Sequence, residues 1–317
     1  MQSFVDWFTA SRLRVIVGAA LFATLAYLPF LLTWLPGALI VLLALRGDRP
    51  LAAWHVAVFV TAMMSWLLLA AGAGPIPAVL VSAGLIVPPL LIGRFLARGG
   101  SLSIAFQFTT VAMLGLIVAV YLIFSDPPGV WQPFVERLAA SLDQAATMMS
   151  TSDSRWQLTS TELREAAADF VNWGAAGSLL LINAIVAAAL GLYAHGRQTR
   201  SAELGPAFRA LKLGRTLATA TVAVLLVSIL VHWEFLRDTR QVFMGALVLQ
   251  GLALLHATRE ILGLGTGWLA ASYALLLIPS TALFAQPVLV VAALLDNWLP
   301  LRERLARLAA KNKAQRS

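Results

Sequence analysis

Long apolar runs separated by short polar stretches set the pattern of this chain. The runs are roughly 15 to 25 residues long, about the length that a helix needs to cross 30 Å of hydrocarbon. Ala and Leu dominate them without the alternation of a barrel strand. Because backbone polar groups in lipid must be satisfied within the segment, the runs predict transmembrane helices. The clearest predicted spans are residues 51–72, 75–97, 102–124, 169–194, 215–235 and 241–258.

Two further regions, 13–45 and 267–300, are apolar for longer than one span requires. Both are interrupted by proline, at positions 29, 36, 279 and 287. Since proline breaks a helix interior, each region fits a hairpin of two short helices better than one long helix. The sequence therefore predicts an all-α transmembrane bundle of about ten spans, within a range of eight to ten, with residues 1–317 as a single domain.

The one sizeable polar insertion is 125–168, which carries six acidic residues against three arginines. This balance is the opposite of that in the basic loops and places the insertion outside the cell. An apolar stripe predicts an amphipathic helix in its first half, and residues 159–162 form a capping box that predicts a second helix. The helices could cover the outer face, dock a partner or lie among headgroups. The stripe consists of Phe134, Leu138, Leu142, Ala145 and Met149.

The amino-acid composition is that of a protein surrounded largely by lipid. Hydrophobic residues make up 60% of the 317 residues, charged residues 12%, and the mean hydropathy is +0.82. Too few polar side chains remain to cover a water-facing surface. We therefore expect a multi-pass protein of a bacterial cytoplasmic (inner) membrane, with the lipid bilayer as its first partner.

The net charge of +8 is concentrated in the loop 195–215 and in the tail 301–317. Cytoplasmic loops retain Lys and Arg, and the arginines at 12, 14, 46, 49, 94 and 98 follow the same rule. Both termini are therefore predicted to be cytoplasmic. The same rule explains the charge without a nucleic-acid partner. In the tail, leucines at 301, 305 and 308 share one helical face among arginines, which predicts a helix on anionic headgroups.

Polar side chains inside apolar runs are the candidates for a ligand site, because each one costs free energy in lipid. We select Gln250, His256, Asn183 and Gln107 as ligand-cavity candidates. The alternative for Gln250 is an interhelical hydrogen bond, and for His256 a position near the interface. No acidic residue lies in the middle of a clear predicted span, which argues against a buried carboxylate relay.

Recognisable catalytic chemistry is missing from the sequence. It has no cysteine, no Walker sequence, no H-E-x-x-H and no G-x-S-x-G, and its four histidines have no metal-ligand spacing. Residues 263–267 (GLGTG) lack the strand and the spacing of a phosphate loop, and we interpret them as a turn. We therefore expect a non-enzymatic protein without a cofactor, a catalytic residue or a metal site.

Three segments together resemble the YybS-like family of predicted bacterial multi-pass membrane proteins. They are the Pro-containing N-terminal region ending at 46–49 (RGDR), 208–215 (FRALKLGR) and 250–256 (QGLALLH). That family is distantly similar to the S components of energy-coupling-factor transporters, which hold a vitamin or metal ion in a helical bundle and depend on a separate ATPase module. S components dock their partner through small residues spaced by four on the first helix, a role that the resemblance gives to Ala19 and Ala23.

Two functions remain open on these grounds. The first is a transporter-like, substrate-binding membrane protein without its own ATPase, which takes a small-molecule ligand and an ATPase module or another membrane protein as partner. The second is a non-enzymatic scaffold or assembly factor that docks partners through the helices of 125–168 and the basic loops.

Overall fold

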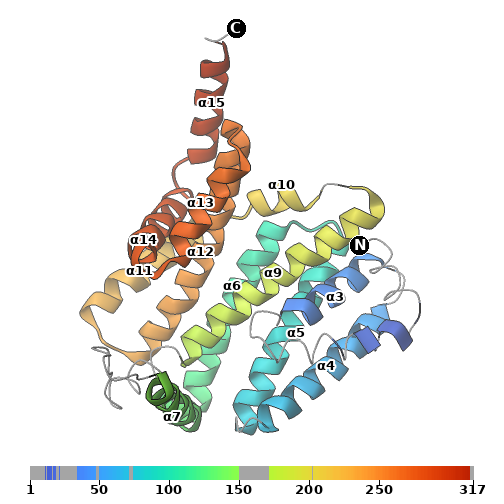
Figure 1. The fold of residues 1–317 in the computed structure, drawn as a ribbon, viewed down its shortest axis with the longest axis vertical. Helices are drawn as coiled ribbons and strands as arrows, with labels where there is room; N and C mark the ends of the chain where they lie inside the picture. Colours follow the sequence, from blue (N-terminus) through green and yellow to red (C-terminus); the bar gives the residue numbers. More distant parts are fainter. Residues whose placement is uncertain are drawn as a thin grey trace.

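The structure is a computed structural model of the chain (Figure 1). It describes residues 34–47, 50–70, 74–149, 171–201 and 203–314, together with residues 11, 13–15, 17, 18 and 21. Helices make up 86% of it, and no strand occurs among the described residues, which confirms the all-α fold. The helices are α3 (Trp34–Leu45), α4 (Pro50–Ala70), α5 (Pro75–Ala97), α6 (Leu102–Ile123), η2 (Pro128–Trp131), α7 (Gln132–Met149), α9 (Trp173–Thr199), α10 (Leu204–Arg209), α11 (Arg215–Leu230), α12 (Glu234–Leu262), α13 (Thr266–Leu277), α14 (Pro279–Leu295) and α15 (Leu301–Ala314).

Four helices in the described part of the chain are long and apolar enough to cross a membrane. They are residues Ala78–Ala97 of α5 and the whole of α6, α9 and α12. Shorter apolar helices accompany them, including α3, α11 and α13. These four helices indicate a membrane protein. The count of ten spans, the hairpins and the positions of the termini stay predictions.

Three helices differ from the predicted spans by four residues or more: α9, which runs from Trp173 to Thr199 against a predicted 169–194, and the two helices that follow α10. The predicted span 215–235 ends early, because Val231 leaves the helical conformation and α11 stops at Leu230, about 24 Å long. The next helix, α12, begins at Glu234, seven residues before the predicted span 241–258. The polar turn from Glu234 to Arg240 is therefore helical and belongs to the longest helix described.

The centre of the bundle is built by α9, which packs against α3, α5, α6 and α12 (Figure 1). Small residues let the backbones approach. A Cβ atom at Gly191 would lie 2.5 Å from Cγ1 of Val41, and one at Gly177 would lie 2.9 Å from Cγ2 of Val242. This is the packing that membrane helices use, because lipid supplies no hydrophobic driving force between them.

The two ends of the bundle differ. At one end, called the basic end here, α9 ends, α10 follows, and α15 packs against α12 and then projects beyond the other helices (Figure 1). At the opposite end, η2 and α7 dock through Trp173, whose indole Nε1 donates to the carbonyl of Pro127 at 2.8 Å and whose ring meets that of Trp131 at 5.0 Å. The buried face of α7 includes Val135 and Ala139, one residue on from the Phe134 and Leu138 of the predicted stripe, which are half-buried.

Candidate functional site

The chain is not helical between α10 and α11, although helices surround it. Residues 210–214 form this unwound segment, and Gly214 ends it with a φ of +84°, a conformation that favours glycine. Leu211 and Leu213 are fully buried. Buried backbone groups outside a helix need partners from elsewhere, and here side chains of four other helices or their flanks supply them.

From α6, two side chains hold the middle of the segment. The hydroxyl of Ser103 accepts from the backbone N–H of Lys212 at 3.1 Å and donates to the carbonyl of Lys212 at 3.3 Å. The amide of Gln107 donates to the same carbonyl at 3.0 Å. Both backbone groups of Lys212 are thereby satisfied by α6.

From α12 and the end of α14, two amides hold the next residues. Oε1 of Gln250 accepts from the N–H of Leu213 at 2.8 Å, and Oδ1 of Asn297 accepts from the N–H of Gly214 at 2.9 Å. Nε2 of Gln250 donates to the carbonyl of Ala293 at 2.7 Å. Gln250 is 0% exposed, so its side chain links three parts of the chain inside the protein.

A buried ion cluster fixes the other side of the segment. Asp296 is 1% exposed, and its Oδ2 lies 2.9 Å from Nη2 of Arg302, while its Oδ1 lies 3.5 Å from Nζ of Lys212. The guanidinium of Arg302 also donates to the carbonyls of Arg209 and Leu211. Two cations and the hydrogen bonds from Arg302 to Oδ2 compensate this buried carboxylate, although its Oδ1 meets Lys212 only as an ion pair. We call Ser103, Gln107, Gln250, Asn297 and Arg302 the clamp.

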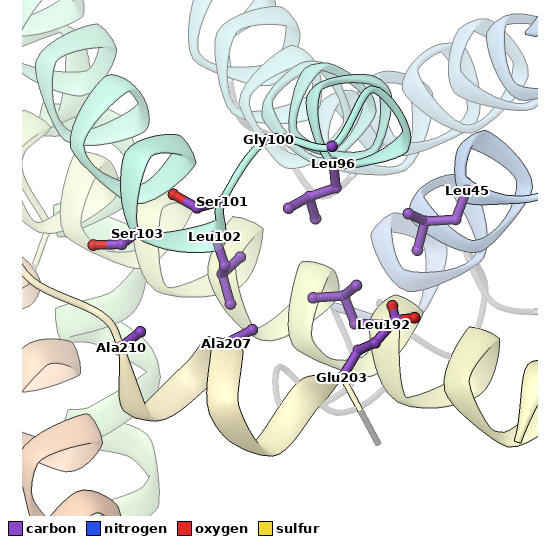
Figure 2. A pocket seen from close by; sticks show the side chains of 11 residues that line it. Leu45, Leu96, Gly100, Ser101, Leu102, Ser103, Leu192, Glu203, Ala207 and Ala210 are labelled. Atoms are coloured by element: carbon purple, nitrogen blue, oxygen red, sulfur yellow. The ribbon is translucent and has the colours of Figure 1, made fainter. Parts of the chain in front are cut away.

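A cavity of about 300 Å³ lies beside the clamp at the basic end (Figure 2). Leu45, Leu96 and Leu192 line it from α3, α5 and α9, while Ala207 and Ala210 line it on the α10 side. Figure 2 also shows the polar groups of the lining, from Ser101, Ser103 and Glu203. Ser103 lines the cavity and also hydrogen-bonds the unwound segment, so the segment lies next to the cavity.

The four predicted cavity residues lie elsewhere. Gln250 and Gln107 belong to the clamp, and the imidazole of His256 hydrogen-bonds the hydroxyl of Tyr273 at 2.9 Å. Asn183 is buried in the middle of α9. None of the four lines the cavity. The docking candidates Ala19 and Ala23 lie outside the described residues, as does the second helix predicted after residue 150.

Sequence reasoning missed the charged part of the site. Membrane topology explains Lys212 and Arg302 on sequence grounds, and Asp296 lies at the end of the apolar region 267–300. The available signal was a single acidic residue at the end of an apolar run, followed by Arg302 six positions later. Asp296 and Asp238 are each 1% exposed, although neither lies in the middle of a clear predicted span.

Comparison with known proteins adds no assignment: no family model, curated protein or solved structure matches the chain. Within the described residues, no three His, Asp or Glu side chains come together as a metal site would require. The geometry of the cavity and the clamp is therefore the ground on which a function can be argued.

Proposed function

We propose that the protein is a transporter-like, substrate-binding membrane protein without its own energy source. Its site is the cavity at the basic end, and its ligand is a small molecule. The observation that supports this most is that the cavity shares Ser103 with the unwound segment 210–214.

Irregular backbone within a membrane bundle is tolerated where protein buries it or where it borders a cavity. Transporters use such interrupted helices at their binding sites, because the break supplies polar groups and a place to bend. Here the break between α10 and α11 is buried, and its first residue, Ala210, lines the cavity. This arrangement supports a binding site more than a purely structural bundle.

The lining restricts the class of ligand. It is mostly apolar, the hydroxyls of Ser101 and Ser103 already bond backbone groups of Ile104 and Lys212, and the carboxylate of Glu203 is its charged side chain. A cavity of about 300 Å³ is at the small end of known ligand pockets. We propose a small, largely apolar molecule that carries a hydrogen-bond donor or a positive charge.

The partner follows from the sequence. The chain has no Walker sequence, so transport would depend on a separate module, and the resemblance to YybS-like proteins and to S components supports an ATPase module in that role. The competing function is a scaffold. The projecting helix α15 favours it, because this basic helix leaves Leu308 56% exposed.

Mass analysis of the purified full chain separates the two functions. A small molecule retained at about one per chain through purification, and released on denaturation, supports the binding protein. An empty bundle with a co-purifying protein at similar stoichiometry contradicts it and supports the scaffold. The protein should be purified in a mild detergent with native lipid, since harsh delipidation removes weakly held ligands.

A further inference from the structure

Two aspartates are buried in the described part of the chain, and their surroundings differ. Asp296 belongs to the ion cluster at the clamp, where Lys212 and Arg302 bring two positive charges to one carboxylate. Asp238 lies near the start of α12, at the opposite end of the bundle, and is 1% exposed. It has no comparable compensation.

The two oxygens of Asp238 have unequal partners. Oδ2 accepts a hydrogen bond from the hydroxyl of Tyr121 on α6 at 2.9 Å. Oδ1 has no hydrogen-bond partner of ordinary geometry among the described residues, although the backbone of Gly174 stabilises the carboxylate, and Nε of Arg237 is 3.7 Å away. Arg237 is also in contact with Glu234 through its Nη2. Two carboxylates therefore share one guanidinium.

Among the described residues, no second cation is paired with Asp238. The first two turns of α9 carry no ionisable side chain, and α6 contributes only the hydroxyl of Tyr121. Gly174 of α9 lies directly over Asp238, since a Cβ atom there would come within 2.5 Å of its backbone carbonyl oxygen. In the turn before α12, His232 is exposed. Close packing thus keeps water and counter-charge from the unpaired oxygen.

A carboxylate buried without full compensation is expensive, and such groups neutralise by taking a proton. We propose that Asp238 is a proton-binding site. One proton from water binds Oδ1 and forms a neutral carboxylic acid, while Oδ2 keeps its hydrogen bond from Tyr121. Loss of that proton returns the carboxylate, which Tyr121 and Arg237 then stabilise. The site goes beyond ligand binding in the cavity and does not depend on it.

Infrared spectroscopy of the full chain in lipid nanodiscs tests the site directly. A protonated carboxylic acid has a carbonyl stretch separate from that of a carboxylate. Exposed carboxyl groups lose this band by about pH 6. We expect one component to persist above about pH 6, to disappear reversibly by about pH 10, and to be missing in Asp238→Asn. The control Asp126→Asn, an exposed aspartate at the same end, should keep it. A spectrum without the band, or with a band unaffected by pH or by Asp238→Asn, overturns the proposal.

A second variant guards against a folding defect in Asp238→Asn. Tyr121→Phe removes the hydrogen bond to Oδ2, and a hydrogen bond to a charged oxygen stabilises it more than one to a neutral acid. In Tyr121→Phe the carboxylic-acid band should therefore disappear with a midpoint about one pH unit higher. An unchanged or lower midpoint in a folded Tyr121→Phe protein contradicts the assignment to Asp238.

Discussion

Gln250→Leu tests whether the clamp stabilises the bundle. The change keeps a side chain of similar size at a position that is 0% exposed, so packing is largely preserved. It removes the acceptor of the Leu213 N–H, which is itself buried and has no other partner among the described residues. The carbonyl of Ala293 keeps a donor, because Nδ2 of Asn297 lies 3.0 Å from it.

The expected loss of unfolding free energy follows from the single backbone N–H, that of Leu213, that the change leaves without an acceptor. A buried group left without its partner costs about 1–3 kcal/mol, so we expect a loss of about 2 kcal/mol of unfolding free energy, or roughly a 30-fold change in the equilibrium. Gln107→Leu is the matched control. The carbonyl of Lys212 keeps the hydroxyl of Ser103 at 3.3 Å after that change, and the site is only half-buried. Its cost should be about 0.5–1 kcal/mol.

Unfolding in mixed micelles with increasing denaturing detergent, followed by tryptophan fluorescence, measures both variants. Gln250→Leu should unfold at a lower detergent fraction than Gln107→Leu, and both below the original protein. A Gln250→Leu protein as stable as the original would refute the clamp. Ligand retention in the same samples tests the alternative: lost ligand at unchanged stability would identify Gln250 as a ligand contact instead.

Three further predictions concern the ion cluster, the unwound segment and the topology. Arg302→Ala leaves the buried Asp296 with Lys212 as its one cation, 3.5 Å from Oδ1, and should cost about 3–5 kcal/mol in the same titration. Exposed Arg304→Ala should cost under about 0.5 kcal/mol, and equal costs would contradict the cluster. Gly214→Ala forces a residue with a side chain into a positive φ and should lower the unfolding free energy by about 1–3 kcal/mol. The control Gly267→Ala, in open space within α13, should change stability little. Thermal unfolding compares the two variants, and an unchanged stability of Gly214→Ala would refute the strain. Reporter fusions after residues 48, 98, 205 and 317 should report the cytoplasm, and fusions after 74 and 145 should report the outside. A C-terminal fusion that reports the outside would reduce the number of spans.

The long apolar helices could be predicted because their signal is local. The predicted spans 75–97 and 102–124 differ from α5 and α6 by at most one residue, since a continuous apolar run with a turn at each end defines a helix in lipid. The start of α12 could not be placed this way. Hydropathy falls at the charged residues before 241, yet they continue the helix because they pair with one another and with Tyr121.

The clamp could not be predicted because its contacts join distant parts of the chain. Gln107 and Lys212 are 105 positions apart, and nothing local indicates that one bonds the other. Membrane topology accounts for Lys212 and Arg302 equally well on sequence grounds, so the position of Asp296 at the end of an apolar run was the one signal of their ion pairs. The interhelical alternative considered for Gln250 does match its hydrogen bonds to Leu213 and Ala293.

Native mass spectrometry of a cavity-filling variant tests the proposed binding site most directly. Ala207→Leu adds side-chain volume at the α10 wall of the cavity, while Ala220→Leu adds the same volume at an exposed position of α11. We predict a ligand adduct on the original protein and on Ala220→Leu, and its loss from folded Ala207→Leu. An adduct retained equally by both variants, or no adduct on any of the three proteins, would contradict binding in this cavity.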